Sequence, residues 1–249
     1  MKNVARGRKS EVKGPKSEVG GQTSRLSHIS ALVLVLTIAS FQTAQAAKRD
    51  ASKVITIVAL GDSLTAGYGL SKKEAYPALI AEKMRSAGYE FDMVNAGSSG
   101  DTTAGGLRRL PEILRLRKKI DIFVLALGIN DAFRGVTIDQ MRSNLQAIID
   151  QTRARHPNVS FIIAGMQLPL YESEGYVRAF GEMFGALAEK NGAALIPYLL
   201  EGVGGDPELN LPDRIHPNAA GQRVLAENVW RVLEPMLGKT AVNTPAGID

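Results

Sequence analysis

Residues 54–63 read VITIVALGDS, and this stretch decides the fold class. Its first seven residues are apolar or β-branched and show no alternation with polar side chains. Such runs are typical of a strand that is buried on both faces of a parallel sheet. A Gly-Asp-Ser turn follows directly, so the sequence predicts that Ser63 lies just beyond the carboxyl end of this first strand.

The same kind of segment recurs along the chain and alternates with amphipathic helical patterns. Strands are predicted at 54–60, 91–94, 122–127, 161–164 and 194–196, and helices at 74–87, 102–118, 138–155, 176–190 and 218–237. Alternation of this kind predicts a parallel sheet with helices on both faces. The right-handed crossover rule then favours the strand order 2-1-3-4-5. Pro111 is expected to kink or break the second helix.

Ligands in such sheets bind beyond the carboxyl ends of the strands, where the strand order reverses. The loops after the first three predicted strands are small, polar and rich in glycine. They comprise residues 61–63, 97–101 and 128–131. Backbone can approach a ligand closely in loops of this composition. Functional residues are therefore expected in these three loops.

The first 46 residues have the composition of a secretory signal. They carry seven basic and two acidic side chains, an apolar stretch at 29–39, and the small-x-small pattern of residues 44–46. The remaining chain has equal numbers of acidic and basic residues, so the net charge of +5 is no sign of a nucleic-acid surface. A membrane anchor is the alternative, but the apolar stretch is about half of the roughly 20 residues that a span needs.

We therefore expect residues 1–46 to be a signal peptide that is cleaved after Ala46, followed by a short linker at 47–53. One domain is expected at 54–237, and a disordered tail at 238–249. The expected location is the periplasm, with secretion as the alternative. The chain has no cysteine, which excludes disulfides, a thiol nucleophile and thiolate metal sites.

A serine hydroxyl is a poor nucleophile until a base accepts its proton, so Ser63 needs a histidine. His216 is preceded three residues earlier by Asp213, whose carboxylate can orient one ring nitrogen and leave the other free. The sequence thus indicates Ser63, His216 and Asp213 as a catalytic triad. Pro217 is expected to open the last helix, which would place His216 at a positive helix terminus and favour a neutral ring.

The other histidine of the expected domain is His156, which has Arg153 three residues before it and is expected at the surface. An Arg cannot orient an imidazole as a proton acceptor, so this histidine is not the predicted base. The arginines at 108, 109 and 134 are likewise expected to be solvated.

Acyl transfer also needs donors for the oxyanion. The three loops offer the backbone N–H groups of Ser63 and Gly100 and the side-chain amide of Asn130. Each motif has a purely structural alternative: Asn130 or Asp131 could cap the following helix, and the segment 213–217 could be a structural turn.

Together these blocks resemble the SGNH, or GDSL, hydrolases. The matching segments are 60–69, 94–103, 127–131 and 213–218, and the resemblance extends over about residues 54–237. Within this family the chain resembles the bacterial group of periplasmic arylesterases and acyl-CoA thioesterase I/lysophospholipase L1. The resemblance implies a flavodoxin-like three-layer α/β/α fold, no metal or cofactor, and broad ester or thioester substrates. In the family pattern the nucleophile falls on Ser63, the glycine on Gly100 and the asparagine on Asn130.

The expected function is therefore a serine esterase that cleaves aryl esters, lysophospholipids or thioesters through an acyl-enzyme on Ser63. Ala132 and Phe133 belong to a loop that resembles the family's acyl-site loop, and Leu168 could form a wall of the acyl pocket. Alternatives are an envelope carbohydrate O-acetyl esterase and a non-catalytic binding module. The expected partner is a small ester or lipid, with no nucleic acid and no stable membrane span after cleavage.

Overall fold

The computed structural model describes residues 54–168 and 173–242, with side chains up to residue 238. The predicted signal peptide and linker lie outside the described residues. Within the described residues, no helix is both long and apolar enough to cross a bilayer.

Five parallel strands form one sheet in the order β2-β1-β3-β4-β5, which confirms the predicted topology. The strands are β1 (Ile55–Gly61), β2 (Phe91–Gly97), β3 (Ile122–Ala126), β4 (Ser160–Ala164) and β5 (Ala194–Ile196). Every residue of β1 and β3 is buried, as expected for strands that are covered on both faces. β2 lies at one edge and is only half-buried, since it has a neighbour on one side.

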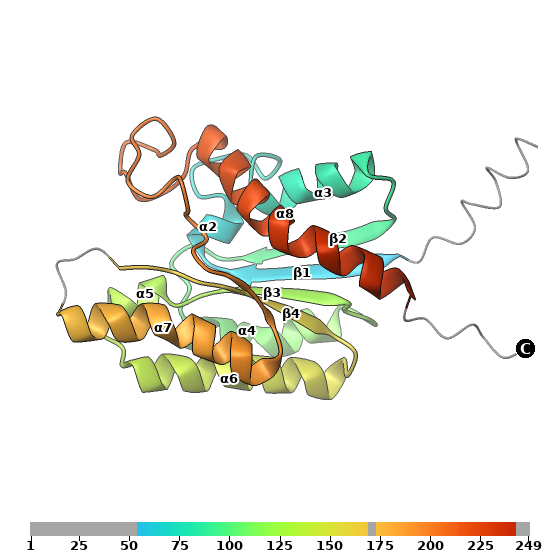
Figure 1. The fold of residues 1–249 in the computed structure, drawn as a ribbon, viewed down its shortest axis with the longest axis horizontal. Coiled ribbons are helices and arrows are strands. Elements are labelled where there is room, and N and C mark those ends of the chain that lie inside the picture. Colours follow the sequence, from blue (N-terminus) through green and yellow to red (C-terminus); the bar gives the residue numbers. More distant parts are fainter. Residues whose placement is uncertain (1–53, 169–172, 243–249) are drawn as a thin grey trace, which may run out of the picture. The chain divides into compact units, whose positions relative to one another are not determined.

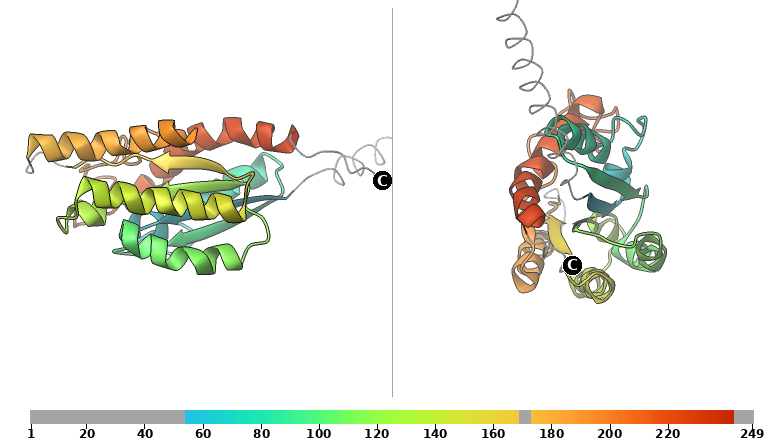
Figure 2. Two further views of the ribbon diagram at one scale, coloured as in Figure 1. Left: turned by 90° about the horizontal axis from the view of Figure 1, so that it is seen from below. Right: turned by 90° about the vertical axis from the view of Figure 1, so that its right-hand side faces the viewer.

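Long helices cover both faces of the sheet and complete the three layers (Figures 1 and 2). One face carries α3 (Tyr76–Ser86) and α8 (Ala219–Val242), and the other carries α4 (Thr103–Arg115), α6 (Ile138–Arg155) and α7 (Glu174–Asn191). Two single-turn helices, α2 (Ser63–Ala66) and α5 (Ile129–Ala132), directly follow β1 and β3 at the carboxyl edge. Two helices therefore begin at this edge, beside the point where the strand order reverses.

Two local predictions concern prolines. Pro111 does not break α4, which continues to Arg115. Pro217 does not open the last helix: it pairs with Asn210 in an isolated bridge, and α8 begins at Ala219. The side-chain oxygen of Asn218 accepts from the backbone N–H groups of Ala220 (2.9 Å) and Gly221 (3.1 Å), as an N-cap does. His216 lies in the turn before this cap, two residues ahead of Asn218, and not directly before the first residue of the helix as expected.

Candidate active site

Ser63 is the first residue of α2 and sits in a sharp turn between β1 and that helix. The turn is stabilised by Asp62, whose side chain accepts from the backbone N–H of Leu64 (3.0 Å). The end of β2 packs closely against α2: a Cβ atom added at Gly97 would lie 2.3 Å from the Ala66 nitrogen. Only glycine permits this approach. The hydroxyl is thereby held in a fixed place at the carboxyl edge of the sheet.

Asp213 and His216 form a compact turn that orients the imidazole. One carboxylate oxygen of Asp213 accepts from the backbone N–H groups of Ile215 (2.9 Å) and His216 (3.0 Å), and the other lies 2.7 Å from His216 Nδ1. The backbone N–H of His216, followed by its ring, lowers the pKa of Asp213 to about 2. Asp213 is therefore a carboxylate at neutral pH. Between them, Arg214 adopts a left-handed φ of 56°, which is uncommon for a residue with a side chain.

The structure brings the predicted triad together although Ser63 and His216 lie 153 residues apart. His216 Nε2 is 3.0 Å from Ser63 Oγ. Because Asp213 accepts only from a protonated Nδ1, the hydrogen-bond network assigns the proton of the neutral ring to that nitrogen. Nε2 is then the acceptor that faces the hydroxyl. This geometry allows the imidazole to take the proton of Ser63 as the oxygen attacks a carbonyl.

The predicted oxyanion groups converge on the same edge. Asn130 lies in α5, and its amide nitrogen is 3.0 Å from the carbonyl of Asp101 and 3.4 Å from Asp62 Oδ2. It thus connects the loop of Ser63 with the loop of Gly100. Gly100 has a left-handed φ of 75°, and its carbonyl accepts two bonds of 3.0 Å from the guanidinium of Arg134.

Of the three arginines that were expected to be solvated, Arg109 is half-buried and bonded to its neighbours, and Arg134 is exposed but also bonded to the Gly100 carbonyl. Arg109 donates to Asp101 (Nε to Oδ2, 2.9 Å) and to the carbonyl of Ala96 (3.1 Å), so it ties the end of β2 to the following loop. Arg134 holds the Gly100 carbonyl, as described above. Arg108 and Arg134 are both exposed, whereas Arg109 is half-buried. The pairing of Arg109 with Asp101 spans the start of α4, so no helical spacing in the sequence indicates it.

The buried carboxyl group of Asp62 is a feature that sequence reasoning missed. Its side chain is fully inaccessible to solvent. This burial raises the pKa of Asp62 to about 7; the Leu64 N–H opposes the rise, and the charges of Asp101 and Asp131 add to it. One sequence feature could have indicated this burial: Asp62 lies beside Ser63 in the Gly-Asp-Ser turn, directly after an entirely buried strand. Its contact with the Asn130 amide makes it a candidate for positioning that donor.

Asp62→Asn tests this burial through stability. The folded pKa of Asp62 lies above that of the unfolded chain, so its contribution to stability is complete below about pH 4 and is lost as pH rises towards 7. The variant cannot titrate there. We expect the free energy of unfolding of the wild type, relative to the variant, to fall by about 2–4 kcal/mol between pH 4 and pH 8. Urea unfolding at several pH values measures this, and a flat difference would contradict it.

The predicted substrate contacts differ in exposure. Ala132 and Leu168 are buried in the hydrophobic core, whereas Phe133 is 52% exposed. Tyr68, which the sequence did not single out, places its ring 4.3 Å from the ring of His216 at an angle of 37°. Nothing in the spacing of these residues indicated this contact, because it joins the loop after α2 to the turn before α8.

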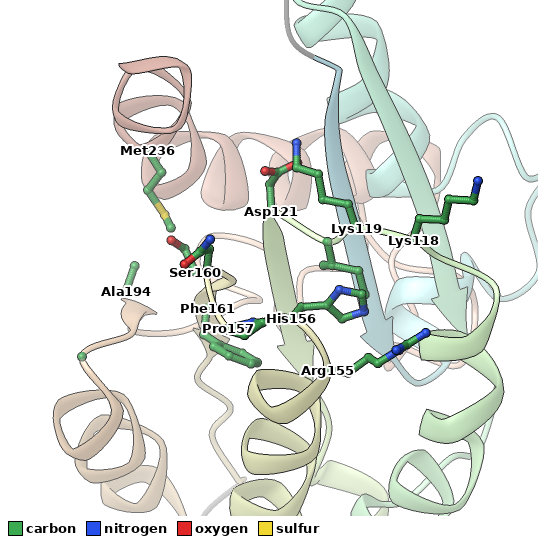
Figure 3. Close-up of a pocket in the computed structure, with 13 residues that line it drawn as sticks. Lys118, Lys119, Asp121, Arg155, His156, Pro157, Ser160, Phe161, Ala194 and Met236 are labelled. Atoms are coloured by element: carbon green, nitrogen blue, oxygen red, sulfur yellow. The ribbon is translucent and has the colours of Figure 1, made fainter. Parts of the chain in front are cut away.

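A separate cavity of about 750 Å³ lies at the opposite, amino-terminal edge of the sheet and is lined by residues that include Lys118, Lys119 and His156 (Figure 3). His156 was expected at the surface, but its side chain is buried where α6 ends and the chain turns into β4. Its Nε2 has no hydrogen-bond partner among the described residues, and burial lowers its pKa. It therefore lacks the hydroxyl and carboxylate partners of His216. Among the described residues, no group of three or more His, Asp or Glu side chains is placed to hold a metal ion.

Comparison with known proteins agrees with this geometry. The sequence profile described as "GDSL-like Lipase/Acylhydrolase family" matches residues 59–224. Esterase TesA of Pseudomonas aeruginosa is 40% identical over 182 residues, which cover 73% of this chain and 89% of the relative. Thioesterase 1/protease 1/lysophospholipase L1 of Escherichia coli strain K12 is 34% identical, with 84% and 93% covered. A crystal structure of TesA superposes with a TM-score of 0.68 at 39% identity and covers 73% of this chain and 99% of its own.

Proposed function

Since the chain belongs to the GDSL-like lipase/acylhydrolase family, we propose that this ester hydrolase works through an acyl-enzyme on Ser63. The observation that carries the proposal is the continuous chain of hydrogen bonds from Ser63 Oγ to His216 Nε2 and from His216 Nδ1 to Asp213. A hydroxyl, a neutral imidazole and an ionised carboxylate in this order form the arrangement that activates a serine nucleophile.

The reaction takes place in two halves. Ser63 Oγ attacks the acyl carbonyl while His216 Nε2 takes the hydroxyl proton, and the Asp213 carboxylate stabilises the imidazolium that forms. When the tetrahedral intermediate collapses, His216 returns this proton to the leaving alcohol or thiol. A water molecule then attacks the acyl-enzyme, with His216 again as base, and releases the acid and the free serine.

In this proposal the oxyanion is bound by the backbone N–H groups of Ser63 and Gly100 and by the Asn130 amide. The contact of that amide with Asp62 and with the Asp101 carbonyl supports the proposal, because it limits the rotation of the side chain before substrate binds. Since the amide nitrogen has only two N–H groups, one of them must exchange its present acceptor for the oxyanion, and the 3.4 Å contact with Asp62 is the weaker of the two. Arg134 and Arg109 hold the Gly100 loop in place from the other side.

Asn130→Ala is expected to lower kcat by about 10²–10³-fold with a smaller change in KM, because the donor acts mainly on the charge of the transition state. Steady-state hydrolysis of a p-nitrophenyl ester measures this. Asn158→Ala is the matched control at the opposite edge of the sheet and should leave kcat unchanged. Loss of less than a factor of three in Asn130→Ala would remove this residue from the oxyanion site.

The substrates proposed for the chain are aryl esters, lysophospholipids and thioesters. The support is that its relatives carry the names esterase, and thioesterase 1/protease 1/lysophospholipase L1. The purified protein is expected to hydrolyse p-nitrophenyl esters across a range of acyl lengths. Activity on acetylated glycan alone, with none on longer acyl esters, would instead favour the carbohydrate O-acetyl esterase.

We propose further that residues 1–46 direct export to the periplasm and are removed. The support is the sequence pattern of a basic segment, an apolar stretch and a small-x-small site. N-terminal sequencing of the protein from a periplasmic extract is expected to begin at Ala47.

A further inference from the structure

Five large hydrophobic side chains of the described residues are strongly exposed: Val54, Tyr68, Leu116, Phe133 and Ile215. We call three of them the rim: Tyr68, Phe133 and Ile215. Their exposed fractions are 48%, 52% and 57%, respectively. Single exposed apolar residues are ordinary, but a group around one site marks an interaction surface.

The rim residues come from three separate segments that meet beside Ser63. The Tyr68 ring lies against the His216 ring in a tilted arrangement, and Ile215 directly precedes His216 with its backbone N–H bonded to Asp213. These two segments pack together, since a Cβ atom on Gly69 would lie 2.7 Å from Leu211. Phe133 ends α5, three residues after Asn130, and so borders the oxyanion side of the same site.

Cationic side chains lie beside each part of the rim. Arg214 is exposed next to Ile215, Arg134 follows Phe133, and Lys72 and Lys73 are exposed in the loop after Tyr68. Apolar side chains that are flanked by Lys and Arg are typical of protein surfaces that rest at a lipid–water interface. Basic groups there attract anionic headgroups while the apolar groups enter the acyl region.

We propose that the rim docks on the surface of a phospholipid bilayer that contains anionic lipid, and that a lysophospholipid passes from this surface directly to Ser63. This inference rests on the proposed function and specifies where the enzyme encounters its ester substrate, namely at a bilayer surface. Ser63 lies at the carboxyl edge of the sheet in the turn before α2, so a lipid whose acyl chain stays partly in the bilayer would present its ester bond to the hydroxyl at this edge. The rim supplies the apolar contact with the bilayer. Arg214, Lys72 and Lys73 supply positive charge that is complementary to the anionic lipid surface.

The test compares one double variant and one single variant on two substrates. Phe133→Ser/Ile215→Ser removes two rim side chains without touching Tyr68 and its contact with His216. Leu116→Ser is the matched control: its side chain is as exposed as that of Ile215, and it lies at the end of α4, away from the three loops of the site. The substrates are lysophosphatidylcholine in vesicles of phosphatidylcholine and phosphatidylglycerol, and soluble p-nitrophenyl acetate.

We expect the ratio of the vesicle rate to the soluble rate to fall about tenfold or more in the double variant, together with loss of co-sedimentation with the vesicles. The ratio should stay unchanged in Leu116→Ser. An unchanged ratio and unchanged co-sedimentation in the double variant would overturn the docking proposal. A defect that appears only as a higher KM for soluble long-chain esters would also overturn it, because the rim would then bind single acyl chains. Failure of the wild type on p-nitrophenyl acetate would instead count against the proposed function.

Discussion

Ser63→Ala is expected to lower kcat for hydrolysis of a p-nitrophenyl ester by about 10⁴–10⁶-fold. The variant lacks the hydroxyl oxygen that lies 3.0 Å from His216 Nε2, so no acyl-enzyme can form at this position. The residual rate would come from the oxyanion donors and from substrate binding. Because alanine is smaller and Ser63 lies at the start of a short helix, the fold should persist.

Two controls make this result specific. Ser143→Ala replaces an exposed serine on α6 and should retain full activity. The double variant Ser63→Ala/His216→Ala should be no slower than either single variant, because residues that act as one unit are non-additive. Activity of Ser63→Ala above about one hundredth of the wild type, with the ester bond still cleaved enzymatically, would rule out the assigned nucleophile.

Asp213→Asn is expected to lower kcat by about 10⁴-fold, as loss of the carboxylate does in other triads. An asparagine can still accept from the backbone N–H groups of Ile215 and His216, so the turn should keep its shape. Its amide, however, donates towards Nδ1 and moves the ring proton to Nε2. The imidazole then presents a donor, and no longer an acceptor, to Ser63.

Asp206→Asn is the matched control for this variant, because Asp206 also accepts from a backbone N–H two residues later, that of Glu208 (2.8 Å), in an exposed turn. It should retain wild-type kcat. Circular dichroism and the midpoint of thermal unfolding check that both variants are folded. A loss of less than tenfold in Asp213→Asn would show that the carboxylate does not fix the tautomer of His216.

Much of the architecture could be predicted because it depends on local patterns. The helix at 138–155 and the strand at 194–196 have the bounds that the sequence predicted, since hydrophobic periodicity and turn residues define them locally. The position of Ser63 after a buried strand likewise followed from the general rule for ligand sites in parallel sheets. Together with the spacing of Asp213 and His216, these patterns were enough to indicate the triad.

The parts that could not be predicted depend on contacts between distant segments. The buried Asp62 has its environment set by residues of two other loops, and Arg109 finds the carbonyl of Ala96 only after β2 and α4 have packed. Gln222 of α8 accepts from the Tyr76 N–H (2.8 Å) and donates to the Leu64 carbonyl (3.2 Å), which ties the last helix to the nucleophile turn. The start of α8 was misplaced because Asn218 caps it and Pro217 is used in a bridge instead.

The most direct test of the account is reaction with a fluorophosphonate, followed by digestion and mass spectrometry of the labelled peptides. The account predicts one adduct per chain, on Ser63, that is absent in Ser63→Ala and forms at least about 10³-fold more slowly in His216→Ala. A stoichiometric adduct on a different residue, with Ser63 unmodified and ester hydrolysis abolished, would contradict it.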